Sequence, residues 1–140
     1  MADALEGGCL CRAVRYRASG EPVTVVYCHC SSCRRASAAP VVAWAMFPLD
    51  RFELAAGKPA VYASSEGVER SFCPTCGTPL TYRADYMPGL VDVTVASFDD
   101  PAALPPQMHI WEAERIHWLD IADRLPRHPD APLPPGAGGD

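Results

Sequence analysis

The chain has little positive charge and no sign of a membrane segment. Among its 140 residues, 12 Lys and Arg face 17 Asp and Glu, which gives a formal net charge of −5. Nucleic-acid binding depends on clustered Lys and Arg that meet phosphates, so this balance argues against a nucleic-acid partner. No apolar stretch approaches the roughly 20 residues that span a bilayer, and residues 1–6 show no basic region followed by an apolar run. We therefore expect a cytoplasmic protein with no membrane partner.

Segments long enough for a regular helix are also scarce. Only residues 31–38 and 99–104 leave room for a turn or two of helix, and the 15 Pro and 10 Gly recur at the boundaries of short strand-like segments. This pattern is typical of an all-β fold with many turns. One continuous apolar run, residues 41–47, is expected to be fully buried. The other expected strands are residues 13–17, 23–27, 51–54, 60–63, 68–72, 79–83, 90–97 and 109–111.

The length fits a single domain, which we assign to residues 1–126. Residues 127–140 are rich in Pro and Gly and poor in apolar side chains. Such a segment cannot bury enough surface to order itself, so we expect a disordered tail.

The residue type that stands out is cysteine, because all seven copies fall into three tight clusters. The clusters are Cys9-x-Cys11, Cys28-x-Cys30-x-x-Cys33 and Cys73-x-x-Cys76-Gly77. Short spacings of this kind let a turn aim two or three sulfurs at one point, as tetrahedral zinc requires. A disulfide framework suits secreted domains, and an odd number of cysteines cannot pair completely. A redox Cys-x-x-Cys opens a helix after a strand, whereas the last cluster reads as a turn closed by Gly and Pro.

Seven ligands divide into four and three, and these numbers have different chemical meanings. Four cysteines make a closed, structural zinc site, while three protein ligands leave a fourth position for water or substrate. The middle cluster can reach one ion unaided, which leaves the first and last clusters to form the closed site across a long loop. Spacing alone also permits a rival arrangement, in which the middle cluster shares an ion with Cys73 or Cys76.

Four motifs follow one another in a distinctive order. They are Gly8-Cys9-x-Cys11 with Ala13-Val14-Arg15-Tyr16, Cys28-His29-Cys30-Ser31-x-Cys33-Arg34-Arg35, Arg70-x-Phe72-Cys73-x-x-Cys76-Gly77-x-x-Leu80, and His109-Ile110-Trp111. Together they resemble the glutathione-dependent formaldehyde-activating enzyme family, which shares its domain with centromere protein V. The match runs from about residue 7 to residue 126, nearly the whole chain outside the expected tail.

The resemblance implies a β-tent fold of packed antiparallel sheets with zinc knuckles and little helix. It also implies two zinc ions per chain, a structural one held by Cys9, Cys11, Cys73 and Cys76 and a second, catalytic one held by Cys28, Cys30 and Cys33. The activity that gives the family its name joins formaldehyde to the thiol of glutathione to form S-hydroxymethylglutathione, which is a carbon–sulfur lyase reaction in reverse. The alternative is a non-catalytic zinc module that recognises a protein or a small thiol, and a fourth protein ligand at the second site would favour it.

Two positions depart from the family pattern. Arg12 follows the first cluster where the family often has glycine, and residues 36–39 replace a glycine that commonly follows the basic pair. Arg34 and Arg35 are candidate substrate-binding residues, because guanidinium groups bind carboxylates and glutathione carries two of them.

The histidines and large aromatic residues are expected to support the structure. His29 occupies the intervening position of Cys28-x-Cys30, where it would point away from the metal and form a hydrogen bond behind the ligands. His109 reads as a satisfied core histidine. Trp44, Phe47, Trp111 and Trp118 are expected in the core, although one of them could line a substrate cleft.

Overall fold

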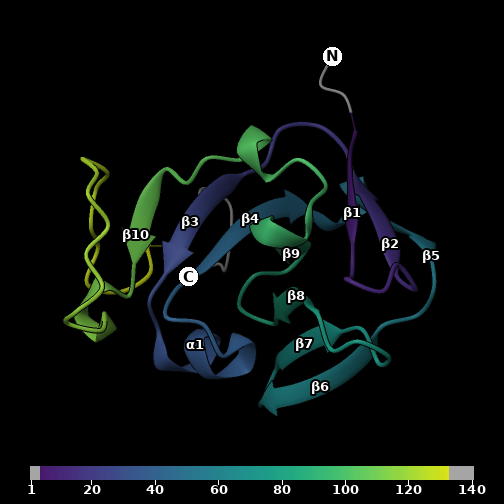
Figure 1. Cartoon of the computed structure of the whole chain (residues 1–140), viewed down its shortest axis with the longest axis horizontal. Coiled ribbons are helices and arrows are strands. Elements are labelled where there is room, and N and C mark those ends of the chain that lie inside the picture. The colour runs from purple at the N-terminus through teal and green to yellow at the C-terminus, as the bar shows by residue number, and fades with distance from the viewer. Residues whose placement is uncertain (1–3, 133–140) are drawn as a thin grey trace.

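Two β-sheets form the framework of residues 4–132, the part of the chain that the computed structural model describes (Figure 1). The strands are β1 (Leu5–Gly8), β2 (Arg15–Ala18), β3 (Thr24–Cys28), β4 (Val42–Pro48), β5 (Phe52–Ala56), β6 (Ala60–Ser65), β7 (Val68–Phe72), β8 (Pro79–Ala84), β9 (Leu90–Thr94) and β10 (Met108–Ile110). The helical elements are α1 (Ser31–Ser37) and the 3-10 turns η1 (Leu49–Arg51), η2 (Val95–Ser97), η3 (Pro101–Ala103) and η4 (Glu112–Glu114). The predicted all-β fold with little helix is confirmed.

The two sheets differ in size and are almost entirely antiparallel. The smaller has the order β1-β2-β5, and the larger has the order β10-β3-β4-β9-β8-β7-β6. The one parallel pair among these strands joins β10 to β3, with His109 opposite Tyr27. This pairing departs from the purely antiparallel expectation. It brings the C-terminal motif beside the strand that delivers Cys28.

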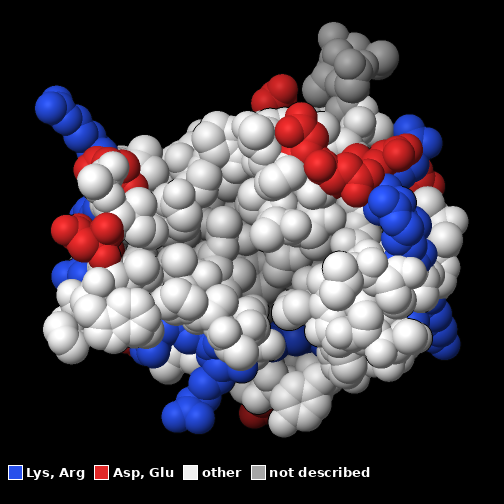
Figure 2. All heavy atoms as spheres, viewed as in Figure 1, with Lys and Arg blue, Asp and Glu red and all other residues white. Residues whose placement is uncertain are grey.

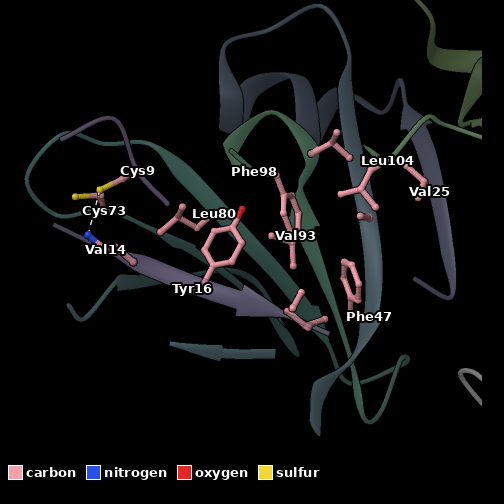
Figure 3. Close-up of a cluster of buried hydrophobic side chains, with 14 residues drawn as sticks. Cys9, Val14, Tyr16, Val25, Phe47, Cys73, Leu80, Val93, Phe98 and Leu104 are labelled. Carbon is pink, nitrogen blue, oxygen red and sulfur yellow. Dashed lines mark hydrogen bonds between the residues drawn. The ribbon is translucent and has the colours of Figure 1, made fainter. Parts of the chain in front are cut away.

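The core lies between the small sheet and one face of the large sheet. Tyr16 from β2 packs in one cluster with Phe47 from β4, Val93 from β9 and Phe98 from the loop after η2 (Figure 3). The rings of Phe98 and Tyr16 pack edge to face, with the centroids 5.1 Å apart. The opposite face of the large sheet is therefore left to form a second surface.

Strand β4 is buried on both faces, as its continuous apolar sequence predicts. Ala45 and Phe47 face the core between the sheets, whereas Trp44 and Met46 belong to two smaller clusters on the other side. The alternation follows from the two-residue period of a strand. The side chains of Trp44 and Met46 consequently point toward the surface that carries the cleft described below.

Most expected strands are found within one or two residues, and the differences have local causes. Strand β1 was not expected, since its sequence Leu-Glu-Gly-Gly has low strand propensity. It forms because it pairs with β2 along its whole length, and glycine is needed at position 7 because a Cβ atom there would lie 2.6 Å from the Ser97 carbonyl oxygen in η2. The strand expected over residues 90–97 ends at Thr94, where the chain enters η2.

The expected helix over residues 31–38 is α1, and the segment expected over 99–104 contains only the short turn η3. None of the helices in residues 4–132 has the length and apolarity needed to cross a bilayer.

The segment expected to be a tail, residues 127–140, is described as far as residue 132. The chain at Arg127 bridges to His109, and the His128 amide donates to the His109 carbonyl at 2.9 Å. The first residues of the expected tail therefore lie against β10. The expectation for residues 133–140 concerns positions outside the described residues.

Candidate active site

The structure gathers the seven cysteines into two separate groups. In each group the sulfur atoms all lie within 4.8 Å of one another. We call them the four-cysteine cluster (Cys9, Cys11, Cys73 and Cys76) and the three-cysteine cluster (Cys28, Cys30 and Cys33). Neither Cys73 nor Cys76 joins the three-cysteine cluster, so the rival arrangement that the spacing allowed is not found.

The four-cysteine cluster joins the two sheets. Cys9 and Cys11 lie in the loop between β1 and β2, and Cys73 and Cys76 lie in the turn between β7 and β8. The Cys11 sulfur is 3.7 Å from the sulfurs of both Cys9 and Cys73. Four sulfurs around zinc at bonds of about 2.3 Å stand roughly 3.8 Å apart, so this spacing fits a closed tetrahedral site.

Backbone and hydroxyl donors surround these sulfurs. The Val14 amide donates to the Cys9 sulfur at 3.2 Å, and the Cys76 amide donates to the Cys73 sulfur at 3.4 Å. A hydrogen bond with the Thr78 hydroxyl lowers the pKa of Cys76 to about 5. Cys9 and Cys73 are buried at the edge of the core, where the dashed line in Figure 3 marks the bond from Val14. The cluster is thus continuous with the packing of the domain.

The three-cysteine cluster is built from one short stretch of chain. Cys28 ends β3, Cys30 is the N-cap of α1, and Cys33 lies in the first turn of that helix. The sulfurs of Cys28 and Cys33 are 3.5 Å apart, and the Cys30 sulfur accepts a hydrogen bond from the Cys33 amide at 3.3 Å. The strand end and the helix cap therefore aim all three sulfurs at one point.

The electrostatics of this cluster favour a cation. Hydrogen bonds from Cys28 and Cys33 lower the pKa of Cys30, while the hydrogen bond with Cys30 raises the pKa of Cys28 above its ordinary value. One thiolate is therefore stabilised at the expense of a second. A bound divalent cation would remove that conflict, since thiolates coordinate it in the ionised form, and an all-sulfur donor set suits zinc.

A cleft of about 1200 Å³ opens beside the three-cysteine cluster. All three of its cysteines line the cleft, and none of the four-cysteine cluster does. The sheet face opposite the core forms one wall, through Trp44 and Met46, and Trp111, which packs against the cluster of Trp44, also lines the cleft. Figure 2 shows the molecule from the side drawn in Figure 1, hollowed near its centre, where the atoms are mostly uncharged, with charged side chains gathered toward the rim.

Arg70 connects the cysteines to the aromatic lining of the cleft. Both terminal nitrogens of its guanidinium group lie 3.9 Å from the Cys33 sulfur, and the group stands over the Tyr82 ring at 4.8 Å from the centroid. The Tyr82 and Tyr86 hydroxyls are hydrogen-bonded at 2.8 Å. Burial raises the pKa of both phenols, so they stay protonated at neutral pH.

The two arginines that follow Cys33 have different surroundings. Arg34 donates to the carbonyl oxygens of His29 at 3.1 Å and Glu114 at 3.3 Å, and so joins the helix α1 to the C-terminal segment. Arg35 is exposed and lines the cleft.

Behind the three-cysteine cluster lies a buried chain of histidines. His29 Nε2 is 2.8 Å from His109 Nδ1, and His109 Nε2 is 2.9 Å from a carboxylate oxygen of Asp123. Burial lowers the pKa of His29, which keeps its ring neutral. When His109 Nε2 donates to Asp123, His109 Nδ1 carries no proton and accepts a hydrogen bond from His29 Nε2. His29 thus makes its hydrogen bond away from the sulfurs, and His109 is buried and fully bonded.

These histidines lie close to Glu112, whose carboxylate is 3.6 Å from His29 and 3.8 Å from His109. Arg115 and Arg127 both donate to that carboxylate at 3.0 Å. Two guanidinium groups therefore already compensate the negative charge of Glu112.

The large aromatic residues divide among three environments. Phe47 is in the core, and Trp44 and Trp111 line the cleft. The core position expected for Trp118 is wrong, because its side chain is 64% exposed.

Sequence reasoning missed two cleft residues, Tyr82 and Asp92. Arg70 precedes the last cysteine cluster and is a candidate for balancing thiolate charge or holding an anionic substrate, but nothing in the sequence indicates that β7 and β8 bring it beside Tyr82 and Cys33. Asp92 had a signal that could have been read, because it is the single acidic residue in the run Leu-Val-Asp-Val-Thr of β9.

Comparisons with known proteins agree with this fold and show the family. The family model described as glutathione-dependent formaldehyde-activating enzyme matches residues 4–114. A Halomonas elongata protein named "Putative glutathione-dependent formaldehyde-activating enzyme" is 30% identical over 129 residues, which cover 86% of this chain and 82% of that protein. A Schizosaccharomyces pombe protein named an uncharacterized lyase is 36% identical over 85 residues, covering 55% of this chain and only 56% of its relative.

The fold also matches a solved structure. A crystal structure of a Rhodobacter sphaeroides protein superposes with a TM-score of 0.56 at 24% identity, covering 68% of this chain and 88% of that one. At this identity the likeness concerns the fold alone. Because the family model spans most of the chain and the Halomonas relative aligns over 82% of its length, the chain belongs to the glutathione-dependent formaldehyde-activating enzyme family.

Proposed function

We propose that the protein is a zinc-dependent carbon–sulfur lyase that acts on the adduct of an aldehyde with glutathione or a similar small thiol. The simplest such reaction forms S-hydroxymethylglutathione from formaldehyde and glutathione. One observation carries the proposal: the cleft reaches all three members of the three-cysteine cluster and none of the four-cysteine cluster. Family membership and the lyase name of a relative support the same class of reaction.

Two zinc ions per chain are part of the proposal. The four-cysteine cluster would hold the structural ion, and the three-cysteine cluster would hold the second. When bound by three thiolates, zinc supplies an open position that favours the thiolate form of a substrate thiol. The sulfur separations and the all-sulfur donor sets described above support this assignment.

The residues of the chain would position the reactants. The substrate sulfur forms a bond to the aldehyde carbon, the thiol proton leaves, and the carbonyl oxygen gains a proton to become a hydroxyl. The protonated Tyr82 and Tyr86 hydroxyls line the cleft and can donate a hydrogen bond to that oxygen. Arg70, beside Cys33, adds positive charge where thiolates gather.

Arg34 and Arg35 are proposed to bind the substrate, one directly and the other indirectly. Arg35 lines the cleft and is exposed, which supports a direct contact with a substrate carboxylate. Arg34 donates to two backbone carbonyls, which supports an indirect part in holding the wall of the cleft.

One feature of the cluster argues against a purely structural zinc module. Among residues 4–132, no fourth Cys, His, Asp or Glu joins the three-cysteine cluster. A closed recognition module would fill that place with a protein ligand. The size of the cleft also favours a substrate, because about 300–1,000 Å³ is enough for a drug-sized ligand.

The proposed reaction is tested by following glutathione and formaldehyde by NMR with and without the zinc-loaded protein. We expect S-hydroxymethylglutathione to form faster than in buffer, and Cys30→Ser to abolish the acceleration while the four-cysteine cluster keeps its metal. A parent protein that holds both ions but does not accelerate adduct formation or breakdown with formaldehyde would contradict the proposal.

A further inference from the structure

Asp92 is a carboxylate placed among apolar and aromatic side chains in the cleft. It lies in the middle of β9, directly opposite Met46 on β4 and Tyr82 on β8. Paired residues of neighbouring strands point to the same face of a sheet. Asp92 therefore shares the face of Met46 and Tyr82, and all three line the cleft.

Within residues 4–132, Asp92 has no hydrogen-bond or ion-pair partner. Burial raises the pKa of its carboxyl group to about 7, and no neighbouring charge or donor contributes. The other acidic residue of the cleft, Glu114, accepts a hydrogen bond from the Ser31 amide at 2.8 Å. A carboxylate that a fold keeps in a cleft without a partner is a candidate for binding a ligand, because leaving it unpaired costs stability.

The separation between Asp92 and the three-cysteine cluster matches an extended small thiol. Asp92 is two strands from Cys28 and four residues farther along β4, which is roughly 10 Å across the sheet and roughly 13 Å along it. Together these make roughly 16 Å between the two backbone positions, of which the Cys28 and Asp92 side chains and their contacts with a ligand take up part. The Tyr86 hydroxyl is near both ends, because the charges of Asp92, Cys33 and Cys28 all contribute to its raised pKa after burial, the largest cause. In glutathione about eight bonds, or roughly 10 Å when extended, separate the sulfur from the ammonium group.

We propose that Asp92 forms a subsite for the ammonium group of the thiol substrate, at the end of the cleft opposite the sulfur-binding site. The proposal rests on the proposed function for the identity of the substrate. With this subsite the two ends of the cleft carry opposite charges. Arg70 and Arg35 are the cationic groups near the cysteines, and Asp92 is the anionic group at the other end. A γ-glutamyl peptide, which carries both carboxylates and an ammonium group, has the complementary charges. Thiols that lack an ammonium group would gain nothing from Asp92.

The experiment separates this subsite from thiol chemistry by using S-methylglutathione, which keeps the ammonium group but cannot form a thiolate. Its affinity is measured calorimetrically for the zinc-loaded parent, Asp92→Asn and Asp85→Asn. Asp85 is an exposed carboxylate of a different, smaller pocket and serves as the matched control. N-acetyl-S-methylglutathione, whose nitrogen is uncharged, serves as the second probe.

We expect Asp92→Asn to weaken S-methylglutathione binding roughly ten-fold to a hundred-fold, the usual effect of losing a hydrogen bond to a charged group. The same substitution should leave the N-acetyl probe unaffected, and Asp85→Asn should change neither. Equal binding of S-methylglutathione by parent and Asp92→Asn, or equal weakening of both probes, would overturn the subsite. So would a parent that binds neither probe.

These outcomes are distinct from failure of the proposed function. If S-methylglutathione binding depends on Asp92 but glutathione and formaldehyde do not react faster with the protein, the subsite stands and the lyase proposal fails.

Discussion

The four-cysteine cluster joins cysteines that are 62 positions apart and lie in loops of two different sheets, whereas the ends of the three-cysteine cluster are five positions apart. The first is continuous with the core, and the second faces the cleft. A ligand set that spans the chain links metal binding to folding of the whole domain. A local ligand set can open toward a substrate without weakening the domain. In our proposal the same residue type therefore serves stability in one place and chemistry in the other.

The largest effect should come from breaking the cluster that spans the chain. Cys73→Ser removes a fully buried ligand that connects the β7–β8 turn to the β1–β2 loop. Zinc binding in such sites contributes roughly 10 kcal/mol in small peptides, which is comparable with the whole stability of a domain. We expect the variant to be unfolded or insoluble, as judged by circular dichroism. A native melting curve with both metals retained would show that this cluster is not structural.

The matching substitution in the other cluster should leave the fold standing. Cys30→Ser affects only the cap of α1 and the metal beside it, while the core and the four-cysteine cluster remain. We expect one zinc ion per chain, a near-native circular dichroism spectrum and no thiol-dependent activity. Global unfolding of this variant would remove the contrast between the clusters.

A third substitution tests how local the three-cysteine cluster is. His109→Ala leaves the buried ring of His29 without its partner, and His29 lies between two of the cysteines. We expect a loss of about 2–4 kcal/mol in the free energy of unfolding, because an unpaired buried polar group costs about 1–3 kcal/mol and a cavity adds to it. A chelator should also remove one of the two metals faster.

The control for this substitution is His117→Ala, since His117 is exposed. If His109→Ala and His117→Ala have equal stability and equal metal retention, the histidine chain does not support the cluster.

On the cleft side, stability should depend on pH through Asp92. Its folded pKa of about 7 lies above the ordinary value of 3.8, so the folded state loses stability progressively as the pH rises from about 4 to 7, and the loss is complete above pH 7. Tyr82 and Tyr86, the titratable groups beside it, stay protonated over this range. Asp92→Asn should therefore be more stable than the parent at pH 9 by up to about 4 kcal/mol, because the shift covers about three units at about 1.4 kcal/mol each.

Between pH 7 and pH 5 this advantage should shrink, which denaturant unfolding of the zinc-loaded proteins can follow. A stability difference that stays constant over that range would mean that Asp92 is not held in an apolar environment.

The smallest effects concern one backbone position near each cluster. Arg12 comes directly after Cys11 and Ala38 caps the helix of Cys33, and their φ angles of 70° and 52° lie in the left-handed region. Arg12 is one departure from the family pattern, and Ala38 lies within residues 36–39, which contain the other. Arg12→Gly and Ala38→Gly should each stabilise the protein by about 0.5–1 kcal/mol.

As a control, Arg17→Gly within the strand β2 should destabilise the protein by a similar amount. If the glycine variants at positions 12 and 38 are also less stable than the parent, their backbone conformations carry no strain.

How far the sequence leads can be judged from particular residues. The fold class follows from short apolar segments bounded by Pro and Gly, and the buried strand β4 follows from its unbroken apolar run. The position of α1 follows from the close spacing of Cys30 and Cys33, which requires a turn at that point. These are local signals, and local signals are visible in a sequence.

The elements that sequence reasoning missed depend on contacts between distant segments. Strand β1 exists because β2 passes beside Gly7, and the parallel pairing of β10 with β3 places His109 against His29. Asp92 can be recognised as a cleft residue only from its pairing with Met46 on one side and Tyr82 on the other. Long-range pairing of this kind leaves no periodic trace in the chain.

The contrast between a closed and an open cluster is tested most directly with cobalt in place of zinc. We predict two cobalt ions per chain and an absorption spectrum in which one ion responds when glutathione is added, while the other does not. The responding ion should be missing in Cys30→Ser. A spectrum that glutathione leaves unchanged, with both ions bound, would show that both clusters are closed and would contradict the account.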